Sequence, residues 1–135
     1  MYLFGGAGLN GRVCGNKLYC LHFSKGIENG EWGVLKFEAN KVSKRYGHNM
    51  EYIKPNLIIF GGTSEENKCL KDVWIINIDE FKDKKVDWTE VKFEGIAPSP
   101  RSYSSSCICK GGRAKGMILF FGGRGEKKEI FNDLW

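Results

Sequence analysis

The sequence predicts an all-β fold built from repeated units of four antiparallel strands. Three short apolar runs each end in a pair of glycines, at Gly5-Gly6, Gly61-Gly62 and Gly122-Gly123. The first glycines of successive pairs lie 56 and 61 residues apart. A short, continuous apolar run between turn-forming residues is typical of a buried strand, and no segment has the sustained 3.6-residue periodicity of a helix. A recurring period of this length indicates a repeat architecture.

Aromatic residues recur in phase with the glycine pairs. One aromatic residue follows each pair, and a tryptophan follows again after the first two. The first series is Tyr19, Trp74 and Trp135, and the second is Trp32 and Trp88. Because these residues repeat in phase, we expect Trp74 and Trp88 to fill the core of their unit rather than to contact a partner. An exposed Trp32 would be an exception to this pattern.

Each unit is predicted to contain four strands. In the second unit the strands are expected at about Tyr46–Ile53, Leu57–Phe60, Val73–Ile78 and Trp88–Phe93. The segments between them carry Gly, Asn, Asp or Pro, as turns require. The first unit lacks its first strand and the third stops within its third strand, which divides the chain into residues 1–38, 39–94 and 95–135. A short helical turn is possible only at Asp79–Asp87.

The combined pattern resembles the kelch repeat. The resemblance is carried by the apolar runs with their glycine pairs, Asp72-Val73-Trp74, Asp133-Leu134-Trp135, the later tryptophans and Arg45-Tyr46-Gly47-His48. It covers essentially the whole chain and implies a fragment of a kelch-type β-propeller, in which each unit is one four-stranded antiparallel blade. Within the family, residues 97–103 and 122–126 look most like those of kelch-type serine/threonine phosphatases, although the phosphatase motifs themselves are absent.

The number of blades predicts further association. A propeller closes with ~4–8 blades, and this chain supplies fewer than three. An uncovered blade face would forgo on the order of ten kcal/mol of apolar burial, against a total domain stability of ~5–15 kcal/mol. We therefore expect the blades to pack against the rest of a longer propeller or against another copy of the chain.

Composition excludes several classes of function. The net charge of +5 is mild and spread along the chain, which favours acidic partners. No basic stripe alternates with exposed aromatic residues, so we expect no nucleic-acid partner. The longest apolar run is too short to span a membrane, no secretory signal precedes the first strand, and the five cysteines form no regular framework. We expect a cytoplasmic or nuclear location.

No set of residues predicts catalysis, a metal or a cofactor. Gly6, Gly8 and Gly11 match the spacing of a dinucleotide-binding loop, but no helix follows to face a phosphate. Cys20 and His22 lie on one face of a strand, yet structural zinc sites use tighter paired spacings. A buried, reduced cysteine is therefore the preferred interpretation.

The histidines also argue against an enzyme. His48 has Ser104 as its counterpart in the third unit, so we interpret it as a packing residue. Galactose oxidase also contains kelch-like blades and holds copper with Tyr, Cys and His, but His22 and His48 are predicted at opposite ends of their blades. That chemistry is the least favoured alternative.

Candidate partner-binding residues lie on one rim of the predicted propeller, where the loops from strand four to strand one meet those from strand two to strand three. They are Arg12, Arg45, Thr63, Arg101 and Arg124. In kelch proteins that bind acidic peptides, arginines occur at the start of strand one, matched by Arg45 and Arg101, and just after the glycine pair, matched by Arg124. The planar guanidinium group pairs well with carboxylate or phosphate. Alternatively, Arg45 and Arg101 brace loops or carboxylates such as Asp72, and the sequence favours neither role.

The chain is accordingly predicted to be a protein-interaction module of a larger kelch-repeat protein, recruiting a substrate or regulator. Its expected partner is a protein or an acidic or phosphorylated peptide, and the chain itself is expected to be no enzyme and to use no cofactor. The alternatives are a regulatory propeller of a serine/threonine phosphatase, which would make the parent protein a hydrolase, and a galactose-oxidase-like enzyme.

Overall fold

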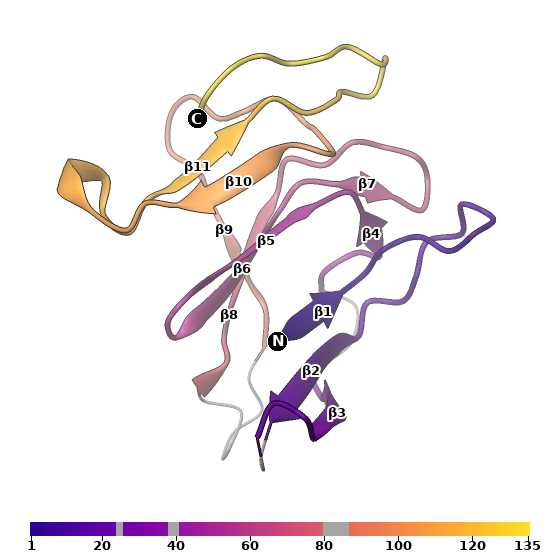
Figure 1. Cartoon of the computed structure of the whole chain (residues 1–135). Helices are drawn as coiled ribbons and strands as arrows, with labels where there is room; N and C mark the ends of the chain where they lie inside the picture. Colours follow the sequence, from indigo (N-terminus) through magenta and orange to yellow (C-terminus); the bar gives the residue numbers. More distant parts are fainter. Residues whose placement is uncertain (24–25, 38–40, 80–86) are drawn as a thin grey trace.

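The computed structural model describes residues 1–23, 26–37, 41–79 and 87–135 and confirms the all-β prediction (Figure 1). No α-helix occurs in these ranges, and a short 3-10 turn, η2, covers Gly112–Ala114. The strands form antiparallel sheets of three, four and two strands in chain order, together with a small two-stranded ladder. Figure 1 shows the three sheets following one another through the molecule.

The second sheet is a complete four-stranded unit. It contains β5 (Asn49–Ile53), β6 (Asn56–Phe60), β8 (Val73–Asn77) and β9 (Thr89–Val91), and neighbours in this order are paired. The strand expected at Tyr46–Ile53 begins only at Asn49, because Gly47 has a φ of 64° and interrupts the extended backbone. The segment before Gly47 is β4 (Arg45–Tyr46), which pairs with β7 (Thr63–Ser64). The helical turn considered for Asp79–Asp87 falls mostly outside the described residues.

The first and third sheets are partial copies of the second. The first contains β1 (Tyr2–Phe4), β2 (Leu18–Phe23) and β3 (Gly30–Leu35), and the third contains β10 (Ser105–Ile108) and β11 (Ile118–Phe121). The register repeats: Phe4 pairs with Leu18, Phe60 with Val73, and Phe121 with Leu134. The first sheet thus corresponds to strands two to four of a unit and the third to strands one and two. The division proposed at residue 38 lies outside the described residues.

The hydrophobic core lies between the first two sheets. Its buried members are Phe4, Leu18, Val42, Leu57, Ile59, Ile76, Ile78 and Trp88. Trp88 is 2% exposed and packs edge-on against Phe4 and Phe37, with ring centroids 5.7 and 6.1 Å apart. Trp32, its counterpart in the repeat of the first sheet, is 55% exposed. The same sequence position therefore becomes core only where a neighbouring sheet covers it.

The first two glycine pairs form the seams between successive units. The Gly6 N–H donates to the Arg45 carbonyl and the Gly62 N–H donates to the Arg101 carbonyl, both at 2.9 Å. Gly5 and Gly61 have φ values near +60°, and an added Cβ would lie 2.3 Å from the Arg45 carbonyl oxygen and 2.7 Å from that of Arg101. A side chain at either position would collide with the next unit. The doublet is thus required by the close approach of two backbones as well as by its turn.

Candidate functional site

Arg45 is completely buried at the seam between the first and second units, where its relative exposure is 0%. Its guanidinium group forms a bidentate pair with Asp72, both contacts being 2.7 Å. The remaining N–H groups donate to the Gly61 carbonyl and to the carbonyl and hydroxyl oxygens of Ser43. All five donors of a guanidinium group are thereby satisfied. Arg45 holds its own unit together through its side chain while its carbonyl accepts from Gly6.

Arg101 repeats this arrangement in the third unit. It is 1% exposed, pairs with both Asp133 oxygens at 2.6 and 2.8 Å, and donates to the Gly122 and Ser99 carbonyls. Its guanidinium carbon also lies 4.3 Å from the centroid of the Phe131 ring. Two independent copies of the same buried network indicate a structural device of the repeat.

The electrostatics of both pairs favour the ionised carboxylates. Burial alone would raise the pKa of the Asp72 carboxyl, but hydrogen bonds and charge from Arg45 outweigh it and lower that pKa below its usual value. Hydrogen bonds from Arg101 and Trp135 hold the pKa of Asp133 far below its usual range. Both arginines are thus committed to internal carboxylates, which supports bracing over partner contact.

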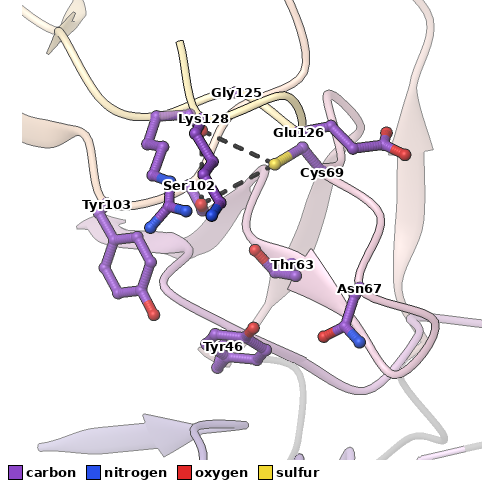
Figure 2. Close-up of a pocket in the computed structure, with 10 residues that line it drawn as sticks. Tyr46, Thr63, Asn67, Cys69, Ser102, Tyr103, Gly125, Glu126 and Lys128 are labelled. Atoms are coloured by element: carbon purple, nitrogen blue, oxygen red, sulfur yellow. Dashed lines mark hydrogen bonds between the residues drawn. The ribbon is translucent and has the colours of Figure 1, made fainter. Parts of the chain in front are cut away.

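An open pocket of about 230 Å³ lies beside this framework, between the second and third units (Figure 2). Its walls come from β4, from the turn after β7, from the segment after Arg101 and from the turn after Gly123. The lining residues are Tyr46, Thr63, Asn67, Cys69, Ser102, Tyr103, Arg124, Gly125, Glu126 and Lys128. We call this the rim pocket. Figure 2 shows the rings of Tyr46 and Tyr103 on one side and the Cys69 thiol near Ser102 on the other.

Backbone pairing fixes the walls of the rim pocket. Ser102 and Arg124 exchange backbone hydrogen bonds of 2.9 and 2.8 Å, so the third unit contributes both residues from one short ladder. Thr63 lies in the equivalent ladder of the second unit, paired with Tyr46. The Tyr46 and Tyr103 rings meet edge to face, 6.2 Å apart. The pocket is therefore assembled where two copies of the same structure meet.

The free charges of the rim pocket are mainly positive. Arg124 and Lys128 are exposed, and neither side chain has a hydrogen bond or ion pair among the residues that the structure describes. Glu126 is the one acidic residue among those lining the pocket. A guanidinium and an ammonium group without internal partners suit a carboxylate or phosphate ligand.

Non-glycine residues with left-handed backbone are concentrated in this pocket. Asn67, Tyr103 and Lys128 are the non-glycine residues with positive φ in the described ranges, at 59°, 58° and 67°, and all three line the pocket. Gly11 occupies the turn position equivalent to Asn67 and Lys128, and Gly47 the position equivalent to Tyr103. Each left-handed position thus has a glycine counterpart elsewhere in the chain. Larger side chains held in this conformation cost stability, as is common at functional sites.

The structure separates the five predicted partner-binding residues into three groups. Thr63 and Arg124 line the rim pocket. Arg12 is exposed on the equivalent turn of the first unit and does not line it. Arg45 and Arg101 are themselves buried at the seams, where Asp72, Asp133 and nearby carbonyls occupy their donors, which corresponds to the bracing role and not to a free contact on the rim.

Sequence reasoning did not single out Tyr46, Tyr103 or Lys128. The search for residues in phase could not find Tyr103, because its counterpart in the second unit is Gly47. A signal was nevertheless available, since a bulky residue at a position that a sister unit fills with glycine is unusual. No cluster of three or more potential metal ligands occurs in the described residues, and no described helix is long and apolar enough to cross a membrane.

Comparisons with known proteins agree with this architecture. The family model described as the KLHDC2/KLHL20/DRC7 Kelch-repeats domain matches residues 1–135. An F-box/kelch-repeat protein of Arabidopsis thaliana is 30% identical over 141 residues, covering 100% of this chain and 28% of that protein.

Two further relatives match shorter stretches. Acyl-CoA-binding domain-containing protein 4 of Arabidopsis thaliana is 30% identical over 76% of this chain and 14% of its own length. Dynein regulatory complex subunit 7 of Chlamydomonas reinhardtii is 30% identical over 71% of this chain and 8% of its own length. The chain thus spans less than a third of each of these relatives. With a family model that matches every residue and a repeated four-stranded unit in the fold, the chain belongs to the kelch-repeat family.

Proposed function

We propose that the chain is a protein-interaction module that binds an acidic segment of a partner protein in the rim pocket between its second and third units. Kelch-repeat domains are generally non-catalytic and bind proteins. The proposal rests on a difference between the arginines, namely whether their N–H donors are already bonded within the protein. Internal acceptors bond the guanidinium groups of Arg45 and Arg101. The Arg124 side chain, by contrast, is exposed at the pocket and has no hydrogen-bond partner among the described residues.

The chemistry of the pocket supports an extended acidic or phosphorylated peptide. Arg124 and Lys128 supply two cationic groups, and the two tyrosine rings supply an apolar wall with hydroxyl groups at the tips. Hydrogen bonds to charged groups contribute about 1.5–3 kcal/mol each. Two such groups beside an aromatic wall can select a short peptide segment while leaving most of the partner unconstrained.

The same repeat geometry supports association of the blades with further propeller structure. Ile59 is 0% exposed at a position where Leu3, its counterpart in the first sheet, is 51% exposed. Trp88 and Trp32 differ in the same way. We propose that the outer face of the first sheet is covered by another blade, from the same protein or from a second copy. The phosphatase and galactose-oxidase alternatives have no specific observation in their favour.

A displayed library of random peptides tests the proposed function. Selection on the purified protein should enrich peptides that contain Asp or Glu, or peptides that bind more tightly when phosphorylated. Arg124→Glu should weaken binding of a selected peptide at least about tenfold, because it replaces an attraction of roughly 1.4 kcal/mol or more by a repulsion. Titration calorimetry or fluorescence anisotropy measures the affinity.

Arg113→Glu provides the matched control. Arg113 is exposed on η2, at the opposite end of the β10–β11 pair from Arg124, so the variant makes the same charge change away from the pocket. Its affinity for the peptide should stay within about twofold of the original protein once salt is fixed. Enrichment of peptides without acidic residues, or equal losses in both variants, would contradict the assignment of the rim pocket.

A further inference from the structure

A second pocket, of about 540 Å³, lies between the first and second sheets at the ends of their strands that point away from the glycine pairs. Tyr2, Cys20 and His22 contribute from the first sheet, and Lys54 and Asp79 from the second. None of these residues belongs to the rim pocket. The site thus combines a thiol, an imidazole, a phenol and two opposite charges around one cavity.

Cys20 and His22 are held as a pair by β2. Residues i and i+2 of a strand point to the same face, and the Cys20 Sγ lies 3.2 Å from the His22 Nε2. Gly33 lies opposite Cys20 on β3, and a Cβ there would be 3.2 Å from the sulfur, so the missing side chain leaves room around the thiol. An imidazole at this distance can accept the thiol proton.

The pair connects a protected thiol to the solvent. Cys20 is only 4% exposed, whereas His22 is exposed, and both border the pocket. Two other cysteines, Cys14 and Cys107, are exposed, and among the described residues neither forms a hydrogen bond to an imidazole. Accessibility alone would therefore make Cys107 the more reactive thiol, while local chemistry favours Cys20.

The charges at the pocket indicate what kind of molecule would react there. Lys54 is exposed at the pocket and offers an ammonium group to a carboxylate. Burial raises the pKa of Tyr2, and the neighbouring Tyr52, Cys20 and Asp79 add to the effect, so the phenol stays neutral and can donate a hydrogen bond. A small ligand with a carboxylate near a sulfur atom fits these groups.

We propose that Cys20 is a modification site that forms a mixed disulfide with a small, carboxylate-bearing disulfide such as oxidised glutathione, with His22 as the proton acceptor. The thiol proton moves from Cys20 Sγ to His22 Nε2, and the sulfur attacks one sulfur of the small disulfide. A new S–S bond forms as the original S–S bond breaks. The departing thiolate takes the proton from His22, so that one thiol is consumed and one is released.

Site-resolved mass spectrometry of the purified, folded protein tests the proposal, with oxidised glutathione as the probe at pH 7. Cys20 should be modified at least as fast as exposed Cys107, despite its burial. His22→Gln should slow the reaction of Cys20 about tenfold or more, since a positioned base is lost, and should leave Cys107 unchanged. The pH profile of the Cys20 rate should also change in this variant, whereas that of Cys107 should not.

Two comparisons keep the test decisive. Lys54→Glu should slow the reaction of Cys20 with oxidised glutathione but not with the uncharged hydroxyethyl disulfide, and equal effects on both probes would overturn the preference for an anionic ligand. If Cys20 stays unmodified while Cys107 reacts, the thiol is only a core residue. A Cys20 rate that is independent of His22 would show that it reacts from an opened form, which also overturns the proposal.

Discussion

Arg45 and Arg124 are the same residue type in two neighbouring parts of one fold, and they differ in almost every physical respect. Arg45 is buried with five hydrogen bonds, whereas Arg124 is exposed and has no described side-chain partner. Arg45 starts a unit and recurs in phase as Arg101, whereas Arg124 follows a glycine pair at a position that is Thr63 in the second unit. The position of an arginine in the repeat determines where its side chain leaves the backbone. The hydrogen-bond acceptors near that position then determine whether the guanidinium group is held inside the fold or remains exposed.

The difference has an energetic consequence. A buried guanidinium group is stable only while its carboxylate partner and backbone acceptors remain in place. An exposed one keeps its hydration and can exchange water for a ligand. The protein therefore uses arginine as a brace at its seams and keeps another arginine available at the rim pocket.

The largest expected effect comes from breaking a seam. Arg101→Ala removes a buried side chain together with its four hydrogen bonds to Asp133 and to the Gly122 and Ser99 carbonyls, so it should lower the free energy of unfolding by about 3–5 kcal/mol, at roughly 1 kcal/mol for each bond lost. Arg124→Ala should change it by no more than about 0.5 kcal/mol. Urea unfolding followed by circular dichroism measures both.

Arg101→Lys sharpens that comparison. A lysine keeps the charge but cannot form the bidentate pair with Asp133 or reach the same set of carbonyls, so most of the stability should remain lost. If lysine restored it, the charge rather than the geometry of the guanidinium group would hold the seam. If Arg101→Ala and Arg124→Ala were equally stable, the division between brace and ligand-binding arginine would be wrong.

The second largest effect on stability is expected from His48, which lies near Arg45 and Phe4. Its Nδ1 is buried without a hydrogen-bond partner in the part of the chain that the structure describes, and its ring meets that of Phe4 edge-on with centroids 5.7 Å apart. Burial, and then the charge of Arg45, lower the pKa of His48 to about 4 from its ordinary 6.5. The folded protein therefore binds fewer protons than the unfolded chain between these values, and stability should fall as the pH drops from about 6.5 to about 4.

The loss over that interval should be roughly 2–3 kcal/mol. Urea unfolding at a series of pH values measures it, and the His48→Gln variant, which cannot titrate, should show a flatter profile. The contribution of Asp72 and Asp133 is lost as the pH falls through the ordinary aspartate value of 3.8 and below it, because the folded-state pKa of each is lowered, so it overlaps only the acid end of the His48 interval. A profile that is unchanged in His48→Gln would show that other groups control the acid response.

The sequence predicted those features that every unit needs. The glycine pairs, the strand positions and the in-phase Trp88 follow from backbone approach and burial, which are the same in each blade. The sequence offered bracing by Asp72 as one of two roles for Arg45 but could not decide between them, because Asp72 is 27 residues away in the chain and only the fold brings the two together. Trp32 shows the same limit, since its exposure depends on a neighbouring sheet and not on its own strand.

The rim pocket was harder to predict because its special residues are out of phase. Tyr103 and Lys128 stand where other units have Gly47 and Gly11, so a search for repeated residues discards them. The physical signal is the conflict between a bulky residue and a left-handed backbone. Residues that differ between equivalent positions of the units therefore indicate the candidate site, whereas residues that are the same at those positions indicate the fold.

The smallest expected effect on stability comes from placing a bulky residue in a left-handed backbone, and two neighbouring lysines test it. Lys128 has a φ of 67°, and Lys128→Gly should raise the free energy of unfolding by up to about 1 kcal/mol because glycine adopts this conformation without strain. It should also weaken binding of an acidic peptide several-fold, because a cation of the rim pocket is lost. Lys127 lies outside the left-handed region, so Lys127→Gly should instead lower stability by about 0.4–1 kcal/mol through the entropy of the unfolded chain. Thermal unfolding measures the stability of each variant, and peptide titration measures its affinity. A Lys128→Gly protein that is less stable than Lys127→Gly would show that the left-handed backbone at Lys128 carries no strain.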